Sequence, residues 1–267
     1  MAEISAALVK ELRERTGAGM MDCKRALQET NGDMDAAIVL LRERGIAGAA
    51  KRAGRETTEG LVGYHLAENG SKGTMVAVGC ETEPVSKNDE FQAFAKKVLD
   101  TVDAGGVGAE AGLETERTEL AAKLGENIAV VGAARFEAVD GATIAAYAHP
   151  PANKLGVLVQ VRGGDAEFGR QLAMHIASAA PQWVGRDDVP AELVTAEREI
   201  YANTDEVNSK PEQAREKIVE GMLNKRFFGA NVLADQEWIW DGSKTVGQAL
   251  QEAGAEVLEF QRFALTR

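Results

Sequence analysis

Residues 8–27 of this chain are LVKELRERTGAGMMDCKRAL, and this stretch decides how the N-terminal part folds. Apolar residues recur at every third or fourth position on both sides of the break Thr16–Gly19, which is the spacing of two amphipathic helices. Glycine accepts the positive φ that a helix end requires. The same spacing returns after the turn Asn31–Asp33. The first 45 residues are therefore predicted to form a compact bundle of three short helices.

Two adjacent methionines, Met20 and Met21, follow the glycine turn. They add more apolar surface than three short helices are expected to cover. Two interpretations are open at this point: one of the methionines contacts a partner protein, or both fill the core of the bundle.

From Gly60 the hydrophobic period changes from that of a helix to that of a strand. Large apolar residues alternate in 62–66 and again in 76–80, on either side of the turn Asn69–Ser71, which predicts a β-hairpin. Helices at 88–102 and 113–124 and a strand at 128–136 are expected to follow, and the pattern then repeats with a hairpin ending in 155–161 and a helix at 165–178.

The two hairpin-plus-helix units can be aligned through the helix starts Glu90-Phe91 and Glu167-Phe168, which indicates an internal duplication. In this alignment the first unit has about four extra residues between strand and helix, within Glu81–Ser86. An insertion at such a turn leaves the scaffold undisturbed and is a common place for binding residues. We therefore predict a projecting loop at this position.

The last third of the chain predicts a protruding helical hairpin at about 186–227, inserted in the second unit. Its second helix begins at Lys210-Pro211-Glu212, with proline in the first turn. The expected apolar seam consists of Leu193, Ile200, Ile218 and Met222. A short helix at 244–253 and a closing strand at 257–263 are expected to return to the second sheet, so the fold class is α+β.

Charge is unevenly distributed along the 267 residues, whose formal net charge is −12. Residues 1–55 have a net charge of +2, which leaves −14 for the rest. An acidic chain is a poor ligand for phosphate backbones, and the basic run Arg42–Arg55 contains no aromatic residue for base stacking. We therefore expect no nucleic-acid partner, and we interpret the basic run as a solvated helical linker.

No stretch of about 18 apolar residues is present, and Met1–Ile4 does not resemble a signal peptide, so we expect a cytoplasmic protein without a membrane partner. Cys23 and Cys80 are interpreted as buried small hydrophobic residues.

The residues that usually indicate chemistry do not form a recognisable constellation. His65, His149 and His175 lack metal-ligand spacing and are interpreted as structural histidines. The chain has no phosphate-binding loop of the Gly-x-x-x-x-Gly-Lys-Ser/Thr type. We therefore expect no catalytic residue, no metal, no cofactor and no direct nucleotide binding: the chain should bind another protein and should not be an enzyme.

The stretch 8–27 closely resembles the opening of bacterial elongation factor Ts, the guanine-nucleotide exchange factor of the translational GTPase EF-Tu. The resemblance extends over the rest of the chain through further short segments: Cys80–Thr82, Asn88–Gln92, Leu124–Ile128, Gly156–Val159, Lys210–Glu212, Lys217–Gly221 and Lys244–Val246.

This resemblance implies three parts: a three-helix, ubiquitin-associated-like domain with its linker in 1–54, a core N-subdomain in 55–140, and a core C-subdomain in 141–267 that carries the inserted hairpin. It further implies that the N-terminal domain binds EF-Tu and that the region of His149 contacts a β-barrel domain of EF-Tu. The implied contact residues of the N-terminal domain are Lys10, Leu12, Met20 and Met21.

The family's characteristic loop, Thr-Asp-Phe-Val-Ala, corresponds here to Thr82-Glu83-Pro84-Val85-Ser86, in which the carboxylate is kept and the aromatic ring is lost. In the family this loop disturbs the Mg²⁺ and phosphate site of EF-Tu, so the resemblance implies an exchange factor with an altered wedge at Thr82, Glu83, Pro84 and Val85. The alternative is an EF-Tu-binding scaffold or chaperone-like module with little exchange activity.

Overall fold

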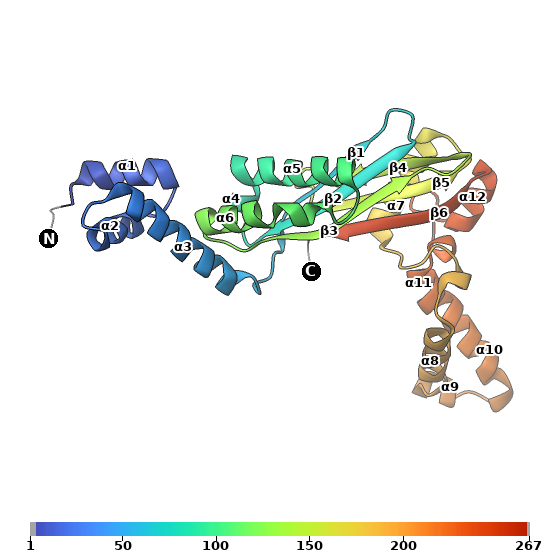
Figure 1. Ribbon diagram of the computed structural model, residues 1–267. Helices are drawn as coiled ribbons and strands as arrows, with labels where there is room; N and C mark the ends of the chain where they lie inside the picture. Colours follow the sequence, from blue (N-terminus) through green and yellow to red (C-terminus); the bar gives the residue numbers. More distant parts are fainter. Residues whose placement is uncertain (1–3, 266–267) are drawn as a thin grey trace.

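The computed structural model describes residues 4–265, and its first three helices lie together at one end of the molecule (Figure 1). They are α1 (Ala6–Thr16), α2 (Met20–Glu29) and α3 (Met34–Arg52). Ser5 caps α1 by accepting a hydrogen bond from the N–H of Leu8, and Asp33 caps α3 in the same way. The helices bury a small core of Val9, Leu12, Cys23, Ala26, Leu27 and Ala37. The predicted three helices are confirmed.

Helix α3 is longer than predicted and includes most of the basic run, so the segment interpreted as a helical linker is indeed helical. It is not solvated on all sides, however, because Ala49 is buried with Leu120 and Ala121 of α6 (Glu114–Leu124). A Cβ atom on Gly45 would lie only 2.8 Å from the Cβ of Ala122. The two helices therefore touch where glycine removes a side chain, and α3 packs the N-terminal bundle onto the rest of the protein.

The first sheet is antiparallel with the order β1-β2-β3. Its strands are β1 (Glu59–Leu66), β2 (Lys72–Cys80) and β3 (Ile128–Glu137). Helix α5 (Asp89–Gly105) begins at Asn88, whose side chain accepts hydrogen bonds from the N–H groups of Glu90 and Phe91. Its inner face packs on Val76 and Val78 of β2. The predicted hairpin, helices and third strand are confirmed.

The second sheet repeats this arrangement with the order β4-β5-β6, also antiparallel. Its strands are β4 (Ala142–Ala148), β5 (Leu155–Arg162) and β6 (Glu256–Ala264), and α7 (Ala166–Ala179) and α12 (Val246–Ala253) pack against them. The β6 strand pairs with β5 although about a hundred residues separate them in the sequence. The predicted return of the closing strand to this sheet is confirmed.

Between β5 and β6 the chain leaves the sheet and forms a helical arm that projects away from the strands (Figure 1). The arm contains α8 (Ala191–Ala202), α9 (Asp205–Asn208), α10 (Glu212–Met222), a π-helical segment (Leu223–Phe228) and α11 (Gly229–Asn231). Short 3-10 turns lie at Arg186–Asp188 and Leu233–Asp235, and another lies at Ala109–Leu113 before α6.

The core of this arm differs from the predicted seam. Ile200 is 57 % exposed, so its assignment to the seam is wrong. Instead, Val207 and the two rings of Phe227 and Phe228 are buried beside Val219 and Met222. The π-helical segment supplies these rings, and helical spacing in α8 and α10 does not predict them.

His175 on α7 is the fully buried histidine of the second unit, and it is a structural histidine as predicted. Its Nε2 lies 3.0 Å from Oε1 of Gln236, and its Nδ1 accepts the N–H of Ile239 at 3.5 Å. The amide of Gln236 is held in place because it donates to Ala179 and Ala230. Burial lowers the pKa of His175, while the hydrogen bond to Gln236 acts in the opposite direction.

We expect the free energy of unfolding to fall as the pH drops below 6.5, the ordinary pKa of histidine. The unfolded chain binds a proton there that folded His175 does not, so acid favours unfolding with a slope of up to about 1.4 kcal/mol per pH unit. Above that pH His175 is neutral in both states and adds no slope. Denaturant unfolding between about pH 7.5 and 5.5 measures this, and the His175→Gln variant should lose the slope. An equal slope in the variant would contradict the assignment.

Candidate functional site

The first candidate surface is formed by the two methionines at the start of α2. Met20 is 55 % exposed and Met21 is 65 % exposed, so the interpretation that both fill the core is wrong. The buried side of α2 consists of Cys23, Ala26 and Leu27, which turns the methionines outward. Flexible thioether side chains on an exposed helix turn can adapt to an apolar patch of a partner protein.

The other two residues implied for this surface lie in different environments. Lys10 is exposed on α1 and forms an ion pair with Glu14 at 3.7 Å. Leu12, in contrast, is 0 % exposed and packs at the centre of the three helices. Its implied role as a contact residue is therefore corrected: in this conformation Leu12 stabilises the bundle that carries Met20 and Met21.

The second candidate surface is the segment Thr82–Val85, and it is not the loop that the sequence predicted. Glu83–Ser86 forms the one-turn helix α4, with Pro84 near its beginning, where the missing N–H of proline costs no hydrogen bond. Pro84 is exposed, whereas Val85 packs partly buried against the core of the first sheet and Ser86 is buried. The turn therefore presents Glu83 and Pro84 on an anchored base.

The carboxylate of Glu126 holds the beginning of this turn. Its Oε2 accepts the backbone N–H groups of Glu81 at 3.1 Å and Thr82 at 3.0 Å, and its Oε1 accepts the hydroxyl of Thr82 at 2.5 Å. No local sequence pattern identifies Glu126 as a partner of Thr82, because 44 residues separate the two.

The turn has a carboxylate, Glu83, and lies beside a thiol, Cys80, and the surroundings of each determine its protonation state. Glu83 pairs with Lys87, with 2.7 Å between Oε1 and Nζ, and this hydrogen bond lowers the pKa of Glu83. Cys80 lies buried at the end of β2, and burial raises the pKa of its thiol to about 12. The thiol therefore stays protonated near neutral pH and is not an activated nucleophile.

His149 follows β4 and is exposed, with its Nδ1 2.7 Å from the hydroxyl of Tyr147. The same connection to β5 contains Lys154, which pairs with Glu59 of β1 and whose charge contributes to the lowered pKa of Glu83. Glu59 is the first residue of β1, so the His149 turn and α4 both lie near the beginning of β1. Met20 and Met21 belong to α2, whose bundle lies at one end of the molecule, apart from the two sheets (Figure 1).

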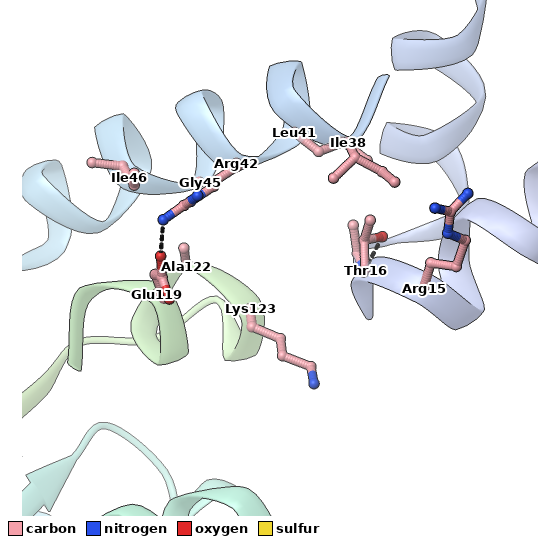
Figure 2. Close-up of a pocket in the computed structure, with 11 residues that line it drawn as sticks. Arg15, Thr16, Ile38, Leu41, Arg42, Gly45, Ile46, Glu119, Ala122 and Lys123 are labelled. Atoms are coloured by element: carbon pink, nitrogen blue, oxygen red, sulfur yellow. Dashed lines mark hydrogen bonds and ion pairs between the residues drawn. The ribbon is translucent and has the colours of Figure 1, made fainter. Parts of the chain in front are cut away.

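A cavity of about 470 Å³ lies where the N-terminal bundle meets α6 (Figure 2). Ile38, Leu41 and Ile46 of α3 contribute apolar side chains to its lining. Its cationic side chains already have carboxylate partners: Arg15 pairs with Asp35, Arg42 with Glu119 and Lys123 with Glu90. The cavity therefore lies at the contact between two parts of the fold, and among the described residues its lining has no unpaired cation that could bind an anionic ligand.

Two negative findings apply to residues 4–265. None of the helices there combines the length and the apolar character required to cross a membrane. Over the same residues, the His, Cys, Asp and Glu side chains do not form a group of three or more that could hold a metal ion.

The family model for elongation factor TS matches residues 81–267. The elongation factor Ts of Thioalkalivibrio sulfidiphilus is 44 % identical over 270 residues, which cover 97 % of this chain and 91 % of the relative. That of Methylococcus capsulatus is 42 % identical with the same coverage. That of Escherichia coli strain K12 is 43 % identical over 98 % of this chain and 92 % of the relative. The chain therefore belongs to the elongation factor Ts family of translation elongation factors.

Proposed function

We propose that this protein is the guanine-nucleotide exchange factor of EF-Tu: it binds EF-Tu carrying GDP, disturbs the Mg²⁺ and phosphate site, and allows GTP to replace GDP. The observation that carries this proposal is the identity of 41 to 44 % to elongation factor Ts proteins over nearly the whole chain. The anchored turn α4, with its exposed Pro84, supplies a structural candidate for the element that acts on that site.

The finer domain layout belongs to the same proposal. The helices in 1–54 form a ubiquitin-associated-like EF-Tu-binding domain, 55–140 and 141–267 form two related subdomains, and 186–227 is a helical hairpin inserted in the second. Supporting this layout, each sheet has three antiparallel strands in sequence order with a helix packed on it, and the helical arm interrupts the second unit before β6.

The proposed action is non-covalent, so the protein is not an enzyme and requires no cofactor. An exchange factor works by binding nucleotide-free EF-Tu more tightly than nucleotide-bound EF-Tu. By thermodynamic linkage, GDP must then weaken the binding of this protein as much as the protein weakens the binding of GDP. Several separate contact surfaces suit this task, because together they supply binding energy while α4 acts on one site.

The alternative function is an EF-Tu-binding scaffold or chaperone-like module with little exchange activity. The specific feature that favours this alternative is Pro84, which stands where the family's loop has an aromatic residue. The two functions differ in one observable, the rate at which EF-Tu releases GDP.

We expect the full chain to accelerate release of labelled GDP from EF-Tu in the presence of Mg²⁺, in proportion to its concentration until EF-Tu is saturated. Stopped-flow fluorescence of the bound nucleotide measures the rate. Labelled GDP alone should show no saturable binding to the chain. Tight binding to EF-Tu without acceleration would establish the scaffold function instead.

Replacing both Met20 and Met21 by alanine should raise the concentration needed for half-maximal exchange by about ten- to a hundredfold. The loss of one buried methionine contact, roughly 1.5 to 3 kcal/mol, corresponds to that range. The maximal rate should change little, because these residues grip EF-Tu without reaching its nucleotide. Val39→Ala on α3 is the matched control, since Val39 is 56 % exposed on the same bundle. Equal effects of both changes would argue against a methionine contact.

Pro84→Phe should increase the maximal rate of GDP release, by about tenfold or more, because an aromatic ring adds buried wedge surface at the exposed position of α4. Glu83→Ala should slow release. Lys87→Ala removes the ion-pair partner of Glu83 and keeps the carboxylate of Glu83. Comparing it with Glu83→Ala therefore distinguishes an effect of the carboxylate on the rate from an effect of the ion pair. If neither Pro84→Phe nor Glu83→Ala changes the rate, exchange does not run through this turn.

A further inference from the structure

The connection between α6 and β3 contacts the segment before α4 through two consecutive residues. Helix α6 ends at Leu124, and the next residue, Gly125, adopts a φ of +76°. This reversal turns Glu126 and Asn127 toward Glu81 and Thr82. Glu126 binds the exposed beginning of the turn, whereas Asn127 is 4 % exposed and binds the structure beneath it.

Asn127 provides a fixed base for its neighbour. Its N–H donates to Oε1 of Glu81 at 2.6 Å, and its side-chain amide donates to the carbonyls of Ala53 at 3.3 Å and Arg55 at 2.8 Å. Arg55 in turn donates to Glu81. The residues after α3, before α4 and before β3 are thereby joined by hydrogen bonds, of which those of Asn127 are partly buried and those of Arg55 with Glu81 are exposed. The backbone that carries Glu126 is therefore held by its neighbour Asn127.

We propose that Glu126 is the positioning residue of the α4 turn, and that its carboxylate orders Thr82 and the residues that follow so that Glu83 and Pro84 are presented in one conformation. This inference rests on the proposed exchange function, and it assigns a role to a residue outside the Thr82–Val85 segment. The carboxylate of Glu126 makes three hydrogen bonds, to the N–H of Glu81 and to the N–H and hydroxyl of Thr82.

The geometry distinguishes positioning from a contribution to overall stability. Thr82 is exposed, so water can replace the carboxylate at its N–H and hydroxyl groups when Glu126 is removed. The core of the first sheet, with Phe91, Val98 and Ile128, lies beneath the turn and does not include Glu126. Removal should therefore cost little stability and should mainly release conformational freedom in the turn.

Loss of order in the turn should affect the rate of exchange more than the binding of EF-Tu. A segment that pushes into a partner has to be ordered when it acts. If the segment is disordered in the free protein, the entropy cost of ordering it raises the activation free energy of GDP release. The Met20–Met21 surface is on a different element and remains unchanged. The variant should therefore bind EF-Tu at similar concentrations and release GDP more slowly.

The test compares Glu126→Ala with Glu126→Gln in the full chain. Glutamine can accept both backbone N–H groups through its carbonyl oxygen and donate its amide to the hydroxyl of Thr82, so it can keep all three bonds without the charge. Glu116→Ala is the matched control, because Glu116 is on α6 and pairs with Lys97 on the surface. Maximal rate and half-saturating concentration of GDP release from EF-Tu are measured, together with hydrogen exchange of the Glu81 and Thr82 amides in the free protein.

We expect Glu126→Ala to lower the maximal rate about tenfold or more, to leave the half-saturating concentration within about twofold, and to speed amide exchange at Glu81 and Thr82. Glu126→Gln should restore most of the rate and protection. An unchanged rate for Glu126→Ala, or a fall in rate equal to that of Glu116→Ala, would overturn the inference. If the unaltered chain does not accelerate GDP release from EF-Tu, the proposed exchange function is refuted. Amide exchange at Glu81 and Thr82 in the free protein is independent of that result and still tests whether Glu126 orders the turn.

Discussion

The two sheets pack together because two residues at their contact have no side chain. A Cβ atom on Gly156 of β5 would lie 2.5 Å from Cγ1 of Val62, and one on Gly73 of β2 would lie 2.7 Å from Cδ2 of Leu158. Any larger residue would push the sheets apart and open the small core between them, which contains Met75 and Ile144. The backbone N–H of Val62 also donates to the carbonyl of Asn153 at 2.6 Å. Six strands thus form one unit on which the other elements depend.

This unit positions the proposed contact elements relative to one another. Helix α4 follows β2 of the first sheet, and the His149 turn joins β4 to β5 of the second, so the close approach of the sheets determines the separation of the two. The three N-terminal helices are attached to this unit where Gly45 of α3 contacts Ala122 of α6. The helical arm projects away from the strands (Figure 1). The proposed exchange function requires such a stiff frame, because force applied by a soft element would deform that element instead of the partner.

For the α4 turn, the sequence predicts the position of the segment but not its conformation. Alignment of the two units in the sequence places the insertion within Glu81–Ser86, and this segment predicts a loop, whereas the structure has the one-turn helix α4 there. Proline at the start of a helix was an available signal, and Pro84 has that position in α4. A four-residue helix has no hydrophobic period, so pattern analysis could not detect it. The exposure of Met20 and Met21 likewise depended on which face of α2 the other helices cover, and the sequence left both interpretations open.

The sequence by itself determined the type and order of the long elements, including the three N-terminal helices, both hairpins and the return of the closing strand, but it did not determine the short helix α4 or the π-helical segment. These follow from hydrophobic periods, caps and turns, which are properties of residues close together in the chain. Only the tertiary structure decided that Leu12 is buried, that Ile200 is exposed, that α3 packs on α6, and that Glu126 holds Thr82. Each of these depends on contacts between segments far apart in sequence, where the partner of a side chain is set by how the elements pack and not by local spacing.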